Sequence, residues 1–399
     1  MSRLVAAPGA VVRVKLTRDL RRTIRRGHPW IFSNAVRVPA DAEPGAIALI
    51  GDKSGRPLAV GYVDPEGPLA IRVCSAEPKV HLDDAWASGR LERALALRRG
   101  LFDGDTTGYR AVNGEGDGLP GLVFDVYGET GVLKLDGPIA ERFWDAPGIA
   151  SWLAERLGLA RVYQRHRTRG NPSGRALVGE APREPVRFLE HGARFTADVV
   201  VGQKTGFFLD QRDNRARVAQ LARDRTVLNV FGYTGGFSIA AGRAGARHVT
   251  TVDLARPAVD AAEAHWRDND LAADAHEGIA ADAFDVLDDA VKRERRWDLV
   301  VLDPPAFAPS REAAANAVRA YTRMVEAGAR VTEAGGICVA ASCSAHVDAQ
   351  EFLQLCEEGV SQARRRATVL GIYGQPLDHP APLACPELRY LKCVFLALD

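Results

Sequence analysis

The sequence predicts an α/β fold, with a mostly parallel, doubly wound sheet in the C-terminal half of the chain. The prediction rests on apolar, strand-like runs that alternate with segments of helix length. The strand-like runs are residues 227–231, 249–252, 299–302 and 337–341, and the helical segments are residues 237–243, 257–269, 283–292, 312–332 and 349–363. A last apolar run, at 390–398, has no helix after it and is expected to be an antiparallel strand.

Two smaller regions precede this sheet. In the first, about residues 1–75, short β-like runs are separated by turn signals, which predicts a small β-barrel or sandwich. Its runs are residues 11–16, 47–50, 58–63 and 69–73. In the second, about residues 76–190, helices and strands mix, which is typical of a small α+β module. Its predicted helices are residues 86–99 and 147–157, and its strands are residues 109–113, 121–127, 132–136 and 161–164.

The composition indicates the cellular location of the protein and the state of its cysteines. The chain has 399 residues, of which 46% are hydrophobic and 26% charged, and no apolar run approaches the roughly 20 residues of a membrane span. Residues 1–10 lack the apolar stretch of a signal peptide, so we expect a cytoplasmic protein with no membrane partner. The 6 cysteines include no C-x-x-C pair. We therefore expect reduced thiols and no metal site.

Charge is distributed unevenly along the chain. The net charge is only +1, yet residues 13–37 carry eight basic residues against a single acid, Asp19. A second stretch, residues 161–175, contains five arginines and no acid. Basic patches on an otherwise balanced protein predict a polyanionic partner.

Ligands of doubly wound sheets bind beyond the carboxyl ends of the central strands, so the residues there are candidate binding residues. A glycine-containing turn follows the first central strand, and such turns let the backbone approach a ligand. Its residues are Phe231, Gly232, Tyr233, Thr234, Gly235, Gly236 and Phe237. Asp253 follows the second strand, where a carboxylate can accept hydrogen bonds from ribose hydroxyls. Asp282 follows a third strand and is expected to meet an adenine amino group.

The ordered series of strand ends predicts a nucleoside-containing cofactor. The G-x-G-x-x-G fingerprint of dinucleotide-binding proteins is missing. Asp303-Pro304-Pro305, after the fourth strand, resembles motif IV of nucleic-acid methyltransferases. Both observations favour S-adenosyl-L-methionine as the cofactor over NAD, and an oxidoreductase is the less favoured alternative.

Ser342-Cys343-Ser344 ends the fifth strand, beside the strand that carries Asp303. A cysteine at such a position is often only a packing residue. Carbon 5 of a pyrimidine, however, becomes nucleophilic only after a thiolate has added to carbon 6. That chemistry needs a cysteine facing the methyl donor and an acid near N3 of the base. Cys343 and Asp303 are therefore candidate catalytic residues. His346 is a candidate general base, although a surface or helix-capping role is the simpler interpretation.

Six segments together are similar to those of a known family. They are Gly27-His28-Pro29-Trp30-Ile31-Phe32, residues 204–212, Tyr233-Thr234-Gly235-Gly236-Phe237, Asp303-Pro304-Pro305, Ser342-Cys343-Ser344 and Asp378-His379-Pro380. Over essentially the whole chain, the sequence resembles the large-subunit (23S) ribosomal RNA cytosine-C5 methyltransferases. The resemblance implies a PUA-like RNA-binding domain at 1–75, an EEHEE-like α+β domain at 76–190 and a Rossmann-like class I methyltransferase domain at 191–399.

The resemblance also implies roles for particular residues. Cys343 matches the nucleophile of the family, and the segment 204–212 is implied to close over the cofactor through Lys204, Asp210, Gln211 and Arg212. The implied partner is RNA, and a homodimer is left open. The candidate RNA contacts are Arg21, Arg22, Arg25, Arg26, His28, Arg165, Arg167 and Arg169. Trp30 is expected to pack in the core of the small domain.

Two departures from the family pattern leave alternatives open. Ala306 follows Asp-Pro-Pro where relatives often have Lys or Thr, and Ala345 follows Ser-Cys-Ser where a glycine is common. A sister branch that methylates a guanine nitrogen is similar at Asp-Pro-Pro but lacks the cysteine. The alternatives are therefore a guanine-N methyltransferase and an RNA-binding factor that retains cofactor affinity without turnover.

Overall fold

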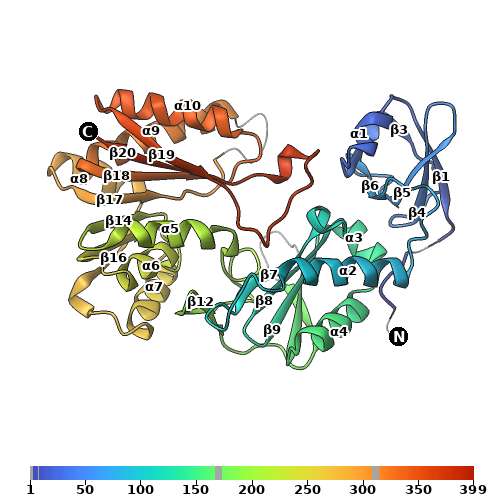
Figure 1. The fold of residues 1–399 in the computed structure, drawn as a ribbon, viewed down its shortest axis with the longest axis horizontal. Helices are drawn as coiled ribbons and strands as arrows, with labels where there is room; N and C mark the ends of the chain where they lie inside the picture. The colour runs from blue at the N-terminus through green and yellow to red at the C-terminus, as the bar shows by residue number, and fades with distance from the viewer. Residues whose placement is uncertain (1–2, 8, 167–172, 308–313) are drawn as a thin grey trace. The chain divides into compact units, whose positions relative to one another are not determined.

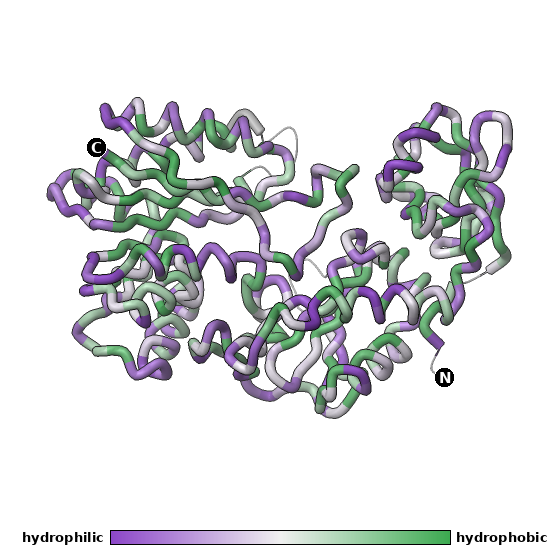
Figure 2. The backbone as a smooth tube through the Cα atoms, viewed as in Figure 1, coloured by the Kyte–Doolittle hydropathy of each residue, from purple (hydrophilic) through white to green (hydrophobic). Residues whose placement is uncertain are grey.

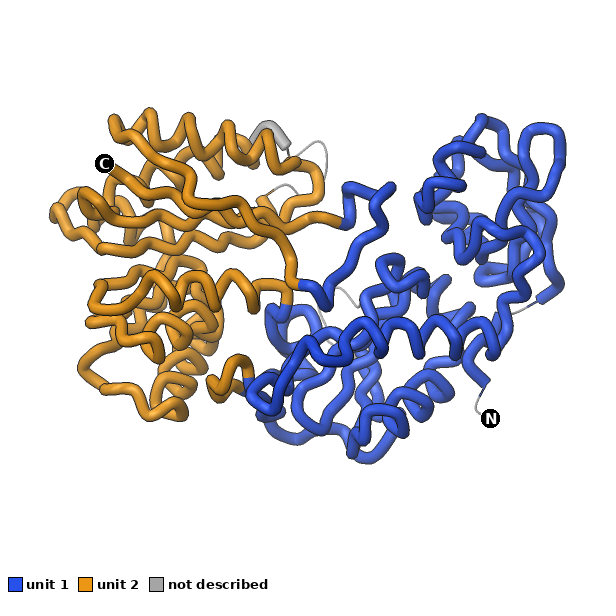
Figure 3. The backbone as a smooth tube through the Cα atoms, viewed as in Figure 1, with its two compact units in different colours: residues 1–189, 196–209, 377–388 blue, residues 190–195, 210–376, 389–399 orange. Residues whose placement is uncertain are grey.

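The computed structural model describes residues 3–7, 9–166, 173–307 and 314–399. It divides the chain into two compact units, shown in Figure 3. Unit 1 consists of Met1–Leu189, Thr196–Leu209 and Leu377–Leu388, and unit 2 consists of Glu190–Phe195, Asp210–Pro376 and Arg389–Asp399. The division into three domains near residues 75 and 190 stays a prediction.

The first sheet of unit 1 is built by the β-rich N-terminal region (Figure 1). Its strands are β1 (Val12–Leu16), β2 (Trp30–Phe32), β3 (Val36–Arg37), β4 (Ile47–Gly51), β5 (Pro57–Val63) and β6 (Leu69–Ser75), in the order β2-β6-β5-β4-β1-β3. Strand β1 alternates buried Val14 and Leu16 with exposed Arg13 and Lys15, as a half-buried strand must. Helix α1 (Arg21–Arg25) buries Ile24 and leaves its arginines exposed.

A second sheet of unit 1 has the order β11-β10-β9-β8-β7. Its strands are β7 (Gly108–Asn113), β8 (Leu122–Tyr127), β9 (Thr130–Leu135), β10 (Arg161–His166) and β11 (Ser173–Val178), and its helices are α2 (Asp84–Arg98), α3 (Pro138–Phe143) and α4 (Ala146–Leu157). The side chains of Asp83 and Asp145 cap α2 and α4 by accepting backbone N–H bonds. Strand β10 is parallel to β9 because α3 and α4 form the crossover between them. The hairpin of β12 (Val186–Glu190) and β13 (Ala193–Ala197) follows.

Residues 377–388, which hold the Asp-His-Pro motif, belong to unit 1 although they follow most of unit 2 in sequence. Asp378 is fully buried, and its carbonyl oxygen accepts a hydrogen bond of 2.7 Å from Nη2 of Arg98. The carbonyl oxygen of Pro380 lies so close to Gly116 that a Cβ there would be 1.8 Å away. The motif therefore anchors this segment to the α+β part of unit 1, and position 116 accepts only glycine.

Unit 2 contains the predicted doubly wound sheet, in the order β16-β15-β14-β17-β18-β20-β19. Its strands are β14 (Thr226–Val230), β15 (His248–Asp253), β16 (His276–Ala280), β17 (Trp297–Leu302), β18 (Thr332–Ser342), β19 (Ala367–Tyr373) and β20 (Lys392–Leu398). Strands β14 to β18 are mutually parallel, whereas β20 is antiparallel to both β18 and β19. The predicted antiparallel last strand is confirmed. The strand order reverses between β14 and β17, which makes that edge the topological switch point.

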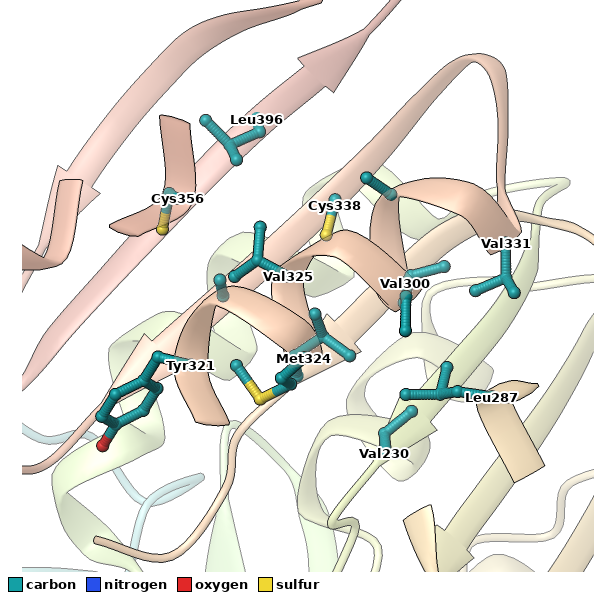
Figure 4. Packing of buried hydrophobic residues seen from close by; sticks show 14 of the residues in the cluster. Val230, Leu287, Val300, Tyr321, Met324, Val325, Val331, Cys338, Cys356 and Leu396 are labelled. Atoms are coloured by element: carbon teal, nitrogen blue, oxygen red, sulfur yellow. The ribbon is translucent and has the colours of Figure 1, made fainter. Parts of the chain in front are cut away.

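Helices pack against this sheet and complete the core of unit 2. They are α5 (Arg212–Ala222), α6 (Gly236–Arg243), α7 (Arg256–Asp268), α8 (Ala283–Lys292), α9 (Ala314–Val331) and α10 (Ala349–Gln362). Figure 2 shows hydrophobic stretches along the strands of the sheet, and Figure 4 shows Tyr321, Met324 and Val325 of α9 among the buried side chains of this core, which also include Val300 and Cys338. Burial of each large apolar side chain stabilises such a core by roughly 1.5–3 kcal/mol. Within the described ranges, no helix has the length and apolarity that crossing a membrane requires.

Candidate active site

The loop between β14 and α6 has an unusual backbone. Phe231, Tyr233 and Gly235 have φ values of 60°, 47° and 81°, in the left-handed region that favours glycine. At the two aromatic positions this conformation costs roughly 1–2 kcal/mol each. A Cβ at Gly232 would lie 2.6 Å from Cγ2 of Thr251, so the chain can pass there only as glycine. Backbone strain of this kind accumulates at ligand-binding sites.

Asp253, at the end of β15, holds this loop in place through a hydrogen bond from the loop's backbone. Its Oδ2 accepts a hydrogen bond of 2.8 Å from the backbone N–H of Tyr233, and its Oδ1 accepts one of 2.9 Å from that of Ala255. The side chain is half-buried, and each carboxylate oxygen can accept a second hydrogen bond. Asp253 can therefore bind a pair of ligand hydroxyls while it holds the loop.

Thr234 provides the observation that tests whether this loop fits a polar cofactor. Its Oγ1 is buried and has no hydrogen-bond partner among the described residues. A buried hydroxyl without a partner costs about 1–3 kcal/mol. Its own carbonyl oxygen accepts a bond of 2.9 Å from Nδ1 of His265, whose pKa is lowered by burial so that the ring stays neutral. A polar group of a bound cofactor would satisfy the hydroxyl. Gly236 and Phe237 are buried in the first turn of α6.

Asp282 follows β16 and is exposed. It caps α8, because its Oδ1 accepts hydrogen bonds of 2.8 Å and 3.4 Å from the backbone N–H groups of Phe284 and Asp285. The ring of Phe284 lies 6.4 Å from that of Phe231, which in turn lies 6.3 Å from that of Phe307. These three rings are in edge-to-face contact and follow the strand ends that also carry Asp282 and the glycine-containing loop.

Asp303 follows β17 and is oriented by side chains of the segment that precedes α5. Its Oδ1 accepts a hydrogen bond of 2.9 Å from Nε2 of Gln211, and Oε1 of Gln211 accepts one of 2.6 Å from Nδ2 of Asn214. Asp210 accepts a bond of 2.6 Å from the hydroxyl of Tyr390. Arg212 begins α5 and is 3% exposed. Two of the predicted residues, Gln211 and Asp303, thus contact each other at the carboxyl edge of the sheet.

The tripeptide Ser342-Cys343-Ser344 is held by a buried tyrosine. The Ser342 hydroxyl donates to the Tyr321 hydroxyl at 2.9 Å, and the Tyr321 and Ser344 hydroxyls lie 2.9 Å apart. Both serines are buried, whereas Cys343 between them is half-buried. The serines therefore anchor the tripeptide and leave the thiol as its accessible group.

Cys343 differs from the other cysteines of the chain. Cys74, Cys338, Cys356, Cys385 and Cys393 are all buried, and Cys343 is not. Burial raises the pKa of Cys338 to about 12, and it raises the pKa of Cys385, beside the carboxylate of Glu387, to about 12 as well. Such thiols are inert at neutral pH. Burial of these five thiols is typical of structural cysteines.

The structure adds residues that the sequence did not single out. Tyr321 lies on α9, and Lys392 at the start of β20 donates from Nζ to the carbonyl oxygen of Ser344 at 2.6 Å. One signal was present for Lys392: it is the charged residue at the beginning of an otherwise apolar strand. His346 is exposed, and Asp348 rather than His346 caps α10.

Several predicted residues lie in unit 1, whereas the strand ends described above lie in unit 2. Lys204 has a φ of 50° and places Nζ 4.3 Å from the ring centre of Phe208. Nη1 of Arg165 donates to the carbonyl oxygen of Gly202 at 2.7 Å. Arg167 and Arg169 lie outside the described residues. The roles of these residues in binding remain predictions.

The arginines of α1 form a basic surface in unit 1. Arg21, Arg22, Arg25 and Arg26 are exposed and line a surface hollow of about 410 Å³ together with Asp19. Asp19 forms an ion pair of 2.8 Å with Arg21, which lowers the pKa of Asp19 to about 2. The hollow therefore keeps a net positive charge. A phosphate group can fit into it and pair with the arginines.

His28 and Trp30 follow these arginines. Nδ1 of His28 lies 3.2 Å from the carbonyl oxygen of Trp30, and the indole N–H of Trp30 donates to Glu115 at 3.0 Å. Trp30 is half-buried rather than enclosed. The core role expected for Trp30 holds only in part, because its indole nitrogen needs the polar partner that it finds at the edge of the core.

Comparisons with known proteins agree with this arrangement. A family model described as S-adenosylmethionine-dependent methyltransferase matches residues 140–369, more than half of the chain, and a PUA-like domain model matches residues 14–76. A protein of Deinococcus radiodurans named Ribosomal RNA large subunit methyltransferase is 41% identical, over 99% of this chain and 98% of that protein. One of Aliivibrio fischeri named Ribosomal RNA large subunit methyltransferase I is 34% identical, over 96% and 98%.

Solved structures show the same fold. The crystal structure of SMU.776, described as a methyltransferase complexed with SAH, has a TM-score of 0.86 at 23% identity and covers 98% of this chain and 100% of that one. A methyltransferase from Streptococcus mutans has a TM-score of 0.85 at 23% identity, over 97% and 100%. The glycine-containing loop, the strand-end carboxylates and the two family models lead to one conclusion: the chain belongs to the S-adenosylmethionine-dependent methyltransferases, among the ribosomal RNA large subunit methyltransferases.

Proposed function

We propose that this chain forms 5-methylcytosine in large-subunit ribosomal RNA, through a covalent adduct between Cys343 and carbon 6 of the base. One observation carries the proposal: the half-exposed thiol of Cys343 follows β18, and the carboxylate of Asp303 follows the adjacent parallel strand β17. The names of the relatives in Deinococcus radiodurans and Aliivibrio fischeri support the choice of large-subunit ribosomal RNA.

The cofactor contacts follow from the loop and the strand ends. Asp253 would accept hydrogen bonds from the ribose hydroxyls, Asp282 would face the adenine amino group, and Thr234 would satisfy its buried hydroxyl on the cofactor. When bound, S-adenosyl-L-methionine supplies an electrophilic methyl group on a positively charged sulfur. The residues of the loop orient this group and exclude water from it.

Cys343 acts as the nucleophile in this proposal. Its thiolate forms a bond to carbon 6 of the cytosine, and the π electrons of the C5–C6 double bond shift so that carbon 5 becomes enamine-like. After carbon 5 carries the methyl group, a base removes its proton. The C5–C6 double bond forms again, and the electron pair of the S–C6 bond returns to sulfur. The target base must leave its stack, because a stacked base hides carbon 6.

Asp303 acts on the opposite side of the ring in this proposal. A carboxyl group at N3 stabilises the negative charge that the addition of the thiolate places on the ring, by donating a proton or a hydrogen bond there. Gln211 donates a hydrogen bond to Oδ1 of Asp303 and thereby fixes the orientation of the carboxyl group. Orientation of the carboxyl group by a neighbouring amide is typical of a positioned acid.

The identity of the product tests this function directly. Bisulfite sequencing of large-subunit ribosomal RNA from cells with and without this protein should reveal one cytosine that resists conversion only when the protein is present. A guanine-N methyltransferase would leave the bisulfite pattern unchanged and add a methylguanosine to the nucleosides of the digested RNA. An RNA-binding factor without turnover would change neither.

The basic surface of α1 is proposed to bind the RNA backbone. Replacing both Arg25→Glu and Arg26→Glu should weaken RNA binding about tenfold or more and lower the slope of log affinity against log salt by about 2. The affinity for S-adenosyl-L-methionine, measured by calorimetry, should not change. The matched control is Arg183→Glu with Arg223→Glu, which makes the same charge change at exposed positions elsewhere. Equal RNA affinities of the two double variants across the salt series would refute this role of α1.

A further inference from the structure

Lys392 is a buried cation beside the tripeptide that carries the thiol. It is 4% exposed, it is the first residue of β20, and it stands opposite Ser342 of β18 in the antiparallel register. Burying an ammonium group costs several kcal/mol unless an opposite charge or a set of hydrogen bonds compensates. A buried lysine in this position therefore requires an interaction that compensates the cost of burying its charge.

The contacts of Lys392 supply only neutral partners. Its Nζ donates to the carbonyl oxygen of Ser344 at 2.6 Å and to that of Tyr390 at 2.8 Å. No carboxylate of the described residues lies within ion-pair distance of it. Asp348 and Glu351, at the beginning of α10, act on it only through weaker, longer-range attraction. The hydrogen-bonding capacity of the ammonium is partly met, whereas its charge is not neutralised.

The acidic group that lies between the residues contacted by Lys392 is the Cys343 thiol. Lys392 pairs with Ser342 on one side of Cys343 and binds the carbonyl oxygen of Ser344 on the other. Tyr321, the other ionisable side chain packed there, is hydrogen-bonded to both serines, and burial raises its pKa, so it remains a neutral phenol. Within the tripeptide, the sulfur of Cys343 is therefore the group that can carry a negative charge. Asp303, Asp348 and Glu351 are the acids of the neighbouring elements, and among the charges that favour the ammonium of Lys392 that of Cys343 is the largest.

We propose that Lys392 is a positioning residue that keeps Cys343 in its thiolate form: the ammonium stays protonated, the proton of the thiol passes to solvent, and the two charges compensate. This proposal rests on the proposed function only for its consequence, because the thiolate is the form that adds to carbon 6. The proposed interaction between the ammonium of Lys392 and the thiolate of Cys343 is a property of the protein without RNA or cofactor.

The electrostatics agree with this geometry. Burial lowers the pKa of Lys392 to about 8, and the negative charge of Cys343 is the largest of the influences that raise it again. Coupling between two ionisable groups is reciprocal, so a lysine whose charge is favoured by the thiolate favours the thiolate in return. The lysine is charged below about pH 8. The stabilisation of the thiolate should therefore be present at neutral pH and disappear as the pH rises through that value.

Alkylation of the intact protein by iodoacetamide, without RNA or cofactor, tests this proposal. Because the other cysteines are buried, modification of the native protein should report Cys343, and peptide mass spectrometry identifies the site. We expect Lys392→Met to move the midpoint of the alkylation rate against pH upward by about one pH unit or more, which slows the reaction at pH 7 about tenfold. Lys392→Arg, which keeps the charge, should restore most of the reactivity.

A structural control distinguishes the effect of losing the lysine charge from the effect of disrupting the local structure around Cys343. Tyr321→Phe removes the hydroxyl that binds both serines but keeps the lysine, so it should leave the midpoint in place. Circular dichroism establishes that each variant is folded. A wild-type profile in Lys392→Met would overturn the proposal, and so would equal shifts in Lys392→Met and Lys392→Arg, since the lost contact to Ser344 would then be the cause. Failure of the proposed function is recognised separately, by methyl transfer that persists in Cys343→Ala.

Discussion

Replacing Cys343 by alanine is expected to lower the rate of methyl transfer to large-subunit ribosomal RNA by about 10⁴-fold or more. Removing the nucleophile of a covalent mechanism abolishes the route by which carbon 5 becomes reactive, and nucleophile deletions in other enzymes cost losses of this size. The measurement is incorporation of a labelled methyl group under single-turnover conditions, with cofactor binding followed by calorimetry. Affinity for S-adenosyl-L-methionine should change little, because the cofactor contacts proposed above lie on other strand ends.

Cys356→Ala is the matched control for this experiment. Cys356 is buried in α10 within the core of unit 2, so the same chemical change there removes a packing atom and no reacting group. It should reduce the free energy of unfolding by about 1 kcal/mol and leave the single-turnover rate nearly unchanged. If Cys343→Ala and Cys356→Ala methylated RNA at similar rates, the guanine-N alternative would gain the advantage, since that chemistry needs no thiol.

Asp303→Asn is the second change with a large expected effect, a loss of about 10²–10⁴-fold in kcat. Asparagine has nearly the same shape, and its oxygen can still accept the hydrogen bond from Gln211, so the strand end should keep its structure. What is lost is the ionisable oxygen proposed to face N3 of the base. The assay is kcat at saturating RNA and cofactor, together with the dissociation constant of the cofactor.

The control for Asp303→Asn is Asp289→Asn on α8, where the carboxylate is exposed and pairs with Arg293. That change should alter kcat less than twofold. A kcat of Asp303→Asn within a factor of three of the wild type would remove Asp303 from the catalytic residues. A loss of cofactor affinity with unchanged kcat would assign it to cofactor binding instead.

The fold of unit 2 could be predicted because its signals are local. The predicted helix at 283–292 has the same bounds as α8, and the predicted strands at 227–231 and 299–302 differ from β14 and β17 by one or two residues at their ends. Buried parallel strands are continuous apolar runs, and their periodicity is visible without any tertiary information.

The edge strands could not be located in the same way. Strand β19 (Ala367–Tyr373) is largely exposed, with Val369, Leu370 and Ile372 between 44% and 48% exposed, so no buried face marks its sequence. Strand β16 (His276–Ala280) has no fully buried residue, and only its place before Asp282 suggested a strand. At a sheet edge, pairing with one neighbour sets the conformation, and the sequence pattern contains little of that information.

The residues of the candidate site also differ in whether the sequence alone could predict their positions. Asp253, Asp303 and Cys343 were predictable, because the carboxyl ends of parallel strands share an edge. Tyr321 and Lys392 were not, since they reach the tripeptide from α9 and β20, across 21 and 48 residues of sequence. A helix pattern shows that Tyr321 faces the core but cannot show which hydroxyls it meets there.

The most direct measurement of the central claim is the capture of the covalent intermediate. Fluorine at carbon 5 of the target cytosine cannot leave as a proton does, so an enzyme that adds a thiolate to carbon 6 stays attached to the RNA after methyl transfer. With large-subunit RNA that contains 5-fluorocytosine and S-adenosyl-L-methionine, we predict a denaturation-resistant complex whose crosslinked peptide contains Cys343. Rapid methylation of natural RNA without any such complex, or a crosslink at another cysteine, would contradict the account.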